Sequence, residues 1–301
     1  MVLWVKGKLR QYTLFYNLYV GYIDLKRKVY LNKWHLKLGK KFSKLIYKPT
    51  LSYIEIDLVA HCNLRCKGCS HFSPLVNQWF ADFREFEKDL QRLRSMFHNI
   101  ESIRLLGGEP LLHPEIIKFI YTTRKIFKNA RISIATNGAL LFSMKNDFWE
   151  ACRKNQIKLN MSVYPPFFNT EERILKWVQS QGVIIYSDKH EKFRAILNLN
   201  GDSDPLKAFK FCRSVVFVPY LYKGAVYICS RPVVIRYFNE RFNHNIPCSS
   251  GIDIYNPDIN GWDVLISILK PVETCRYCIT YKQKFAWDES TFSANEWHFD
   301  V

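Results

Sequence analysis

Three cysteines, Cys62, Cys66 and Cys69, fall within the stretch HCNLRCKGCSH (residues 61–71). Thiolates bind zinc and iron–sulfur clusters, so a triplet this dense indicates a metal site. Structural zinc sites usually take four ligands, and one of the two flanking histidines could complete such a set. Three thiolates from one loop can instead bind three irons of a four-iron cluster and leave the fourth iron open. The triplet alone leaves both interpretations open.

A second motif, LGGEP (residues 106–110), follows after the next β-rich segment. Gly107 and Gly108 permit a close approach of the backbone. Glu109 offers a carboxylate that could bind an ammonium group. By itself the motif is a glycine turn before a helix with an early proline. Its combination with the cysteine triplet indicates a cofactor site.

Together these motifs resemble those of the radical S-adenosylmethionine (radical SAM) superfamily over roughly residues 50–285. CNLRCKGC is similar to the family's cluster loop, and LGGEP to its motif for the amino group of SAM. The resemblance implies a partial (β/α)6 barrel, of the TIM-like kind. It also implies a 4Fe–4S cluster on the triplet and a 5′-deoxyadenosyl radical that abstracts hydrogen from a substrate carbon.

Further positions of the SAM site come from the same resemblance. Thr136, Asn137 and Ser162 end the next two predicted strands and resemble positions that contact ribose or carboxylate. Turn or capping roles are equally compatible with these residue types. Gly68 departs from the family pattern, which usually has an aromatic residue just before the third cysteine. Either Phe72 or another side chain is expected to fill that place, or the adenine pocket is more open.

Four more cysteines have the spacing C-x16-C-x45-C-x2-C, namely Cys212, Cys229, Cys275 and Cys278. The spacing alone is compatible with a zinc ribbon. It resembles the Twitch-type (SPASM-like) domain of radical SAM dehydrogenases and epimerases of aminocyclitols and aminoglycosides. That resemblance implies a second 4Fe–4S cluster. Four thiolates would leave it no open iron, so it would carry electrons rather than cleave SAM.

Two cysteines remain outside these sets. Cys152 lies in a helical pattern and is expected to be a small buried hydrophobic residue. Cys248 lies in the turn-rich stretch HNIPCSSG. In sugar and peptide epimerases of the superfamily, a lone thiol donates a hydrogen atom to the substrate radical. Cys248 is therefore a candidate donor, and an inert loop cysteine or a spare cluster ligand is the alternative.

Alternating β-rich and helical segments predict an α/β fold with a parallel sheet. Strands are expected at residues 53–59, 102–108, 131–138, 157–163, 182–187 and 194–199, and helices at 83–97, 114–127, 145–155 and 169–181. In such sheets functional groups gather at the carboxyl ends of the strands. The cysteine triplet, GGEP, TNG and SVYPP segments should therefore converge on one rim.

The alternation stops near residue 205, and a hairpin with Lys-Gly at its turn is predicted within residues 215–230. We predict four parts, which are an N-terminal extension (1–50), a radical SAM partial barrel (51–204), a Twitch-like domain (205–285) and a tail (286–301).

The composition, 48% hydrophobic and 24% charged, is that of a globular protein. Residues 1–50 hold 12 Lys and Arg against one acid, out of a net charge of +17. This basic, aromatic segment is compatible with a helical extension packed on the barrel, or with contact to an anionic membrane face. Nucleic acid is the least favoured partner. No leader or spanning segment is recognised, and nine cysteines indicate metal chemistry, so we expect a cytoplasmic location, with contact to the inner membrane face through residues 1–50 as an option.

The resemblance, together with the presence of Cys248, implies a radical SAM epimerase of a carbohydrate, such as a nucleotide sugar or a surface-glycan precursor, served by a flavodoxin- or ferredoxin-type reductant. If the auxiliary cluster removes an electron instead, the enzyme is a dehydrogenase of a sugar or cyclitol alcohol. A peptide-modifying enzyme is disfavoured, because 50 residues without strand signals are too short for a winged-helix recognition domain. The non-enzyme alternative is a zinc-binding adaptor.

Overall fold

A computed structural model describes residues 38, 40, 41, 48–215, 218–280 and 283–298. The predicted N-terminal extension and its membrane contact therefore lie almost wholly outside the described residues. None of the helices within these ranges combines the length and apolar character needed to cross a membrane.

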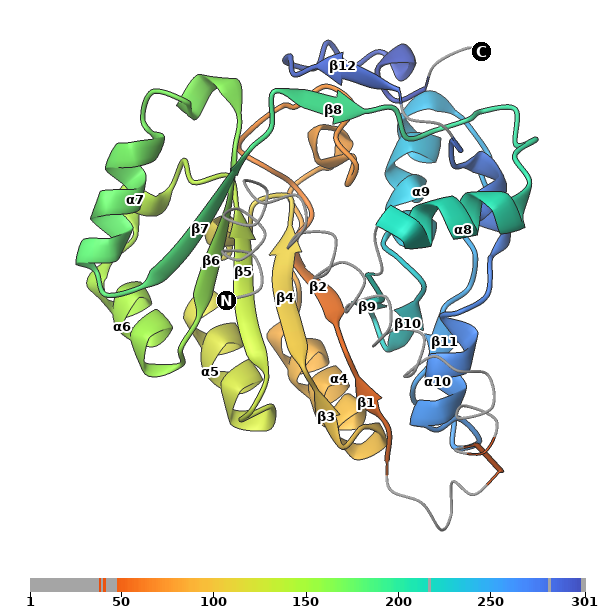
Figure 1. The fold of residues 1–301 in the computed structure, drawn as a ribbon, viewed down its shortest axis with the longest axis horizontal. Helices are drawn as coiled ribbons and strands as arrows, with labels where there is room; N and C mark the ends of the chain where they lie inside the picture. Colours follow the sequence, from red (N-terminus) through yellow and green to blue (C-terminus); the bar gives the residue numbers. More distant parts are fainter. Residues whose placement is uncertain (1–37, 39, 42–47, 216–217, 281–282, 299–301) are drawn as a thin grey trace, which may run out of the picture.

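Eight strands form the central sheet (Figure 1). They are β2 (Ile54–Val59), β4 (Ser102–Gly107), β5 (Arg131–Thr136), β6 (Lys158–Val163), β7 (Ile184–Lys189), β9 (Tyr220–Tyr222), β10 (Ala225–Tyr227) and β11 (Ile252–Asp253). Their order is β11-β10-β9-β2-β4-β5-β6-β7. The six from β9 to β7 pair in parallel, and β10 and β11 add antiparallel pairs at one edge. The fold is thus mixed α/β with a parallel-rich sheet, in agreement with the predicted partial barrel.

The helices that follow the parallel strands lie along one side of this curved sheet (Figure 1). They are α4 (Phe83–Met96), α5 (Ile116–Ile126), α6 (Asn146–Lys154) and α7 (Glu171–Ser180), each close to its predicted range. Their apolar stripes and the outward residues of the strands form one large core. In α4 the stripe includes Phe86, Leu90 and Leu93, all buried.

Further elements lie outside this regular alternation. The helices are α8 (Pro205–Val215), α9 (Arg231–Phe242) and α10 (Gly261–Ser267). Two small sheets pair β1 (Thr50–Leu51) with β3 (Asn99–Ile100), and β8 (Lys192–Arg194) with β12 (Lys284–Ala286). A second, smaller core joins Phe72 of the cysteine loop with Phe238 of α9 and with Trp297.

The prediction of a barrel strand at residues 194–199 is wrong. Strand β8 ends at Arg194 and belongs to the small sheet with β12, while Leu197 forms isolated bridges to Cys278 and His298. The sixth parallel strand is β9, which pairs with β2 at Glu55 and Ile56. Local sequence could not indicate this pairing, because β9 has only three residues.

The predicted hairpin is confirmed as β9 and β10. Its turn residues, Lys223 and Gly224, both have positive φ angles, as the Lys-Gly pair suggested. The hairpin pairs with β2, so the main sheet continues across the predicted domain boundary near residue 205.

Cys152 is fully buried in α6, within the main core. We expect Cys152→Ala to lower the free energy of unfolding by about 1 kcal/mol. Cys152→Ser should lower it by about 1–3 kcal/mol, because a hydroxyl replaces a weakly polar thiol in an apolar site. Urea unfolding measures both effects, and metal analysis should find unchanged iron. Loss of iron in either variant would contradict a purely structural role.

Candidate active site

The cysteine loop and the glycine motif meet at the carboxyl ends of β2 and β4, as predicted. The Gly108 amide donates to Val59 O at 2.7 Å, and the Glu109 amide donates to His61 O at 3.1 Å. A Cβ on Gly107 would lie 1.9 Å from Val59 O, and one on Gly108 would lie 2.0 Å from His61 O. No larger residue fits at either position without moving backbone. The glycines therefore permit the approach of the cysteine loop itself.

Glu109 joins this pair of loops to the end of β5. Its Oε1 accepts from Thr136 Oγ1 at 2.8 Å and from the Leu111 amide at 3.1 Å. Its Oε2 accepts from the Asn137 amide at 2.8 Å. The side chain is fully buried, and burial raises the pKa of the carboxyl to about 7 although these three bonds lower it. The carboxylate thus serves as a brace between loops, and its direct contact with an ammonium stays a prediction.

The cysteine triplet lies beside this brace. Asn137 Nδ2 donates to Asn63 Oδ1 at 2.7 Å and lies 3.6 Å from Cys62 Sγ. Burial, with a smaller contribution from the nearby Cys69, raises the pKa of Cys62 and of Cys66 to about 12. The three thiols therefore lie within electrostatic range of one another, and those of Cys62 and Cys66 are protonated at neutral pH without a metal.

The four C-terminal cysteines also lie together, although the sequence separates them widely. Cys212 raises the pKa of Cys229, Cys275 and Cys278, after the larger effect of burial. Cys278, whose own pKa burial raises to about 11, also acts on Cys229. Cysteines from α8, from the end of β10 and from the turn at residues 273–277 therefore lie close together.

Both thiol sets fit the groups predicted for them by donor chemistry. Within the ranges that the structure describes, no three His, Cys, Asp or Glu side chains are already arranged around a metal position. Metal binding would therefore require the thiols to reorient and to lose their protons. Three thiolates suit a cluster with one open iron, and four suit a closed cluster or zinc.

Tyr164 is a site residue that sequence reasoning missed. Burial raises its pKa, the three cysteines of the triplet raise it further, and it shares a side-chain hydrogen bond with Ser162. Ser162, at the end of β6, thus lies on the same rim as the triplet. The SVYPP segment was predicted to reach this rim, but nothing in it distinguished the tyrosine.

An aromatic side chain from another segment occupies the space beside Gly68 where a side chain at that position would lie. Its φ angle is +63°, and a Cβ there would lie 2.4 Å from Cζ of Phe285 and 2.8 Å from Glu296 O. Phe285, rather than Phe72, therefore occupies the space at Gly68, and its contact with adenine stays a prediction. Phe72 is fully buried in the second core, against Trp297 and Phe238.

The inner face of the sheet, which we define by Glu55 and Asp57 of β2 and Arg104 of β4, is polar. Arg104 lies 3.8 Å from Glu55, and His71 Nε2 lies 3.8 Å from Asp57 Oδ1. Burial lowers the pKa of His71, which keeps it neutral, and raises that of Asp57 to about 7. Charged residues between the apolar ones of YIEIDLV were the available sequence signal for this face.

Four buried polar atoms in this region have no hydrogen-bond partner among the described residues: Asp57 Oδ1, His71 Nε2, Arg104 Nε and Arg231 Nη1. Arg231, the first residue of α9, acts electrostatically on His71 and on Cys229 and Cys278. The unpartnered atoms thus extend from the inner face toward the C-terminal cysteines. Unsatisfied buried groups are costly, so this region is suited to a polar ligand.

Cys248 lines a pocket of about 340 Å³ together with Tyr222, Tyr227 and Arg236. Arg236 donates to Tyr222 Oη at 2.6 Å and lowers the pKa of Asp57, so the pocket adjoins the inner face. Burial raises the pKa of the Cys248 thiol, and the charge of Arg236 opposes this.

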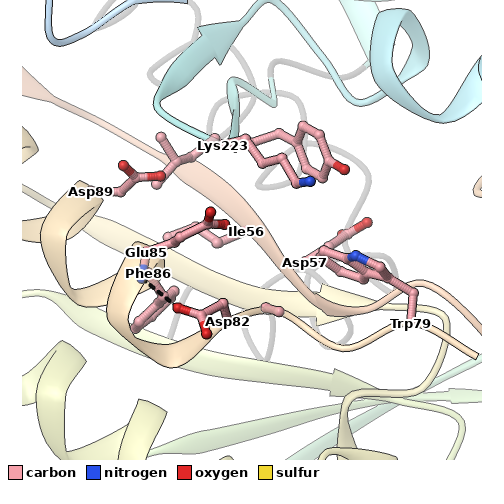
Figure 2. A pocket seen from close by; sticks show the side chains of 11 residues that line it. Ile56, Asp57, Trp79, Asp82, Glu85, Phe86, Asp89 and Lys223 are labelled. Atoms are coloured by element: carbon pink, nitrogen blue, oxygen red, sulfur yellow. Dashed lines mark hydrogen bonds between the residues drawn. The ribbon is translucent and has the colours of Figure 1, made fainter.

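A second cavity lies between α4 and the β9–β10 turn (Figure 2). Asp57 and Trp79 lie at one end of it, and Asp89 and Lys223 at the other. Its volume is about 40 Å³, which is room for little more than one water molecule. It is too small to hold a substrate.

The buried Glu109 predicts a pH dependence of stability. Its pKa of about 7 exceeds the unfolded value of 4.5, so the native state retains a proton that the unfolded chain releases between these values. The native protein should therefore lose stability as pH rises from 4.5 to 7, by roughly 3 kcal/mol from this group. Urea unfolding of the metal-free protein should show a shallower decline for Glu109→Gln. Asp57, whose pKa is also about 7, lowers the stability of both proteins over the same pH range. If stability fell equally steeply with pH in the wild type and in Glu109→Gln, the raised pKa assigned to Glu109 would be contradicted.

Comparison with known proteins relates these motifs to a family. Residues 56–178 match the radical SAM superfamily. GTP 3′,8-cyclase of Microcystis aeruginosa is 25% identical over 205 residues, which are 67% of this chain and 58% of that protein. GTP 3′,8-cyclase of Clostridium acetobutylicum is 32% identical over 137 residues, 44% of this chain and 41% of that protein. The chain thus spans about half the length of the curated relatives it matches.

Solved structures give weaker likenesses. BtrN in complex with AdoMet and 2-DOIA has a TM-score of 0.46 and 16% identity, over 79% of this chain and 100% of that chain. The protein anSMEcpe with bound AdoMet has a TM-score of 0.38 and 22% identity, over 46% and 43%. With TM-scores below 0.5, neither carries an argument about the reaction. The family match covers the cysteine triplet, the LGGEP motif and strands β4 to β6, and residues 56–178 accordingly form a radical SAM domain.

Proposed function

We propose that this radical SAM enzyme epimerises a carbon of a carbohydrate, with Cys248 as the hydrogen-atom donor. When bound, SAM and the cluster at Cys62, Cys66 and Cys69 supply a radical that removes a hydrogen atom from the substrate. The fate of the resulting carbon radical depends on the groups of the chain that face it.

The position of Cys248 carries this proposal. Its thiol lines the 340-Å³ pocket, which adjoins the polar inner face through Tyr222 and Arg236. Burial raises the pKa of the thiol, which favours the protonated form that hydrogen-atom donation needs. The charged groups that act on its thiol are Arg236, which lowers the pKa, and Glu240, which raises it.

The donation balances as a single hydrogen-atom transfer. The S–H bond of Cys248 breaks and a C–H bond forms on the substrate, on the face opposite to the abstraction. The resulting sulfur radical needs one electron and one proton to regenerate the thiol. A reductant of the flavodoxin or ferredoxin type would supply the electron, either directly or through a cluster held by the quartet.

The unpartnered atoms of the inner face support a substrate rich in hydroxyl groups. Asp57 Oδ1 can accept a hydrogen bond, and Arg104 Nε and Arg231 Nη1 can donate. A hydroxyl both donates and accepts, so a polyol can satisfy such a mixed set, whereas a purely anionic group would face Asp57 and Glu55. A nucleotide sugar or a lipid-linked glycan precursor combines hydroxyls with charge that the basic N-terminal extension could attract.

Two other reactions have a specific observation in their favour. Oxidation of an alcohol needs a base, and Asp57 on the inner face has a pKa of about 7. Cyclisation of GTP is the activity named for the two curated relatives from Microcystis and Clostridium. Each predicts a different product, so one assay separates all three.

We expect the anaerobically reconstituted, reduced enzyme to convert one member of a substrate panel in deuterated water, with SAM, to a product one mass unit heavier. The panel should hold nucleotide sugars, glycan precursors, aminocyclitols and GTP. Cys248→Ala should lose this product while 5′-deoxyadenosine still forms, because abstraction does not need the thiol. Mass spectrometry measures both.

Cys152→Ala is the matched control. It removes the other cysteine that belongs to neither the triplet nor the quartet, and this cysteine is buried in the core. It should leave the heavier product unchanged. A product two mass units lighter, insensitive to Cys248→Ala, would instead establish a dehydrogenase. Turnover of GTP with no need for Cys248 would establish a cyclase.

Metal analysis tests the cysteine quartet separately. We expect about eight irons and eight sulfides per reconstituted chain, because each of two cubane clusters holds four irons. The double variant Cys275→Ala/Cys278→Ala should lose about half of them and keep the SAM-responsive signal in electron paramagnetic resonance. One zinc per chain that disappears in this variant, with iron unchanged, would make the quartet a zinc site.

A further inference from the structure

The C-terminal segment 284–298 covers the cysteine loop. Strand β12 pairs with β8, and the chain then lies alongside residues 65–67 (Figure 1). The Lys67 amide donates to Asp288 O at 2.9 Å, the Ser290 amide donates to Arg65 O at 2.7 Å, and Cys66 and Glu289 form an antiparallel bridge. The segment is therefore joined to the loop by backbone bonds on both sides of Cys66.

Two tryptophans of this segment donate to the loop in different ways. The Nε1 of Trp287 donates to the sulfur of Cys66 at 3.2 Å. The Nε1 of Trp297 donates to the backbone oxygen of Cys69 at 3.0 Å. Only the first of these two bonds reaches an atom that would bind iron. The second holds the backbone and leaves the Cys69 sulfur untouched.

We infer that Trp287 sets the reduction potential of the cluster held by the triplet, through its hydrogen bond to the ligand sulfur of Cys66. The inference rests on the assignment of Cys66 as a cluster ligand, and it requires Trp287 to keep this bond when the thiols reorient around the cluster. Hydrogen bonds to sulfur are one of the ways in which proteins adjust cluster potentials. An N–H donor stabilises negative charge on sulfur, and a cluster gains negative charge on reduction. The bond therefore favours the reduced state, which is the state needed to cleave SAM.

The variant Trp287→Phe keeps an aromatic ring and removes the donor. In a redox titration of the full-length holoenzyme, followed by electron paramagnetic resonance, we expect its midpoint potential to shift to more negative values. The signal that changes on addition of SAM identifies the relevant cluster. Trp297→Phe is the matched control. It also removes an indole N–H from the loop, but one that donates to a carbonyl, and its potential should stay at the wild-type value.

A measurement on the wild-type protein tests the same bond without a substitution, so it does not depend on whether Trp287→Phe or Trp297→Phe folds. With tryptophan labelled by ¹⁵N at the indole nitrogen, pulsed electron paramagnetic resonance of the reduced cluster should detect one coupled ¹⁵N. Absence of that coupling, or equal potentials in Trp287→Phe and Trp297→Phe with iron retained, would overturn the inference alone. Wild-type protein that assembles no SAM-responsive cluster would overturn the cluster assignment and the inference with it.

Discussion

The rim of this barrel depends on a buried carboxylate that has no cation beside it among the residues the structure describes. Glu109 accepts from the Leu111 amide, from Thr136 and from the Asn137 amide, and so connects the ends of β4 and β5. The backbone of the same motif binds the ends of β2 and the cysteine loop. Desolvation opposes this arrangement, as the raised pKa shows, while preorganised donors offset part of the cost. The loops are therefore held in place before any cofactor binds.

Much of this rim could be predicted from the sequence, because its parts are local. The ranges of α4 to α7 and of five barrel strands follow from periodicity and turn residues. The cysteine triplet and LGGEP are contiguous motifs, and their positions after strands determined that they would meet. The radical SAM assignment followed from them and is supported by the family match.

The parts that sequence reasoning missed depend on contacts between distant segments. Strand β9 is three residues long, and its place beside β2 is decided by pairing rather than by propensity. Phe285 fills the space at Gly68, yet nothing near either residue indicates this. Tyr164 and Arg231 belong to the site only because the fold brings their segments beside the cysteines. The charged residues within β2 and β4 did indicate the polar inner face, since charged side chains are rarely buried in strands unless they are paired.

The pairing of β12 with β8 also bears on the order in which the protein matures. Trp287 follows its partner Cys66 by 221 positions in the sequence. Synthesis is slow compared with the formation of local structure, so β2 to β7 can form long before residue 287 is translated. The C-terminal segment 284–298 consequently packs on the cysteine loop last. Iron delivered during synthesis would meet an open loop, whereas iron delivered afterwards would meet a loop whose Cys66 is already buried.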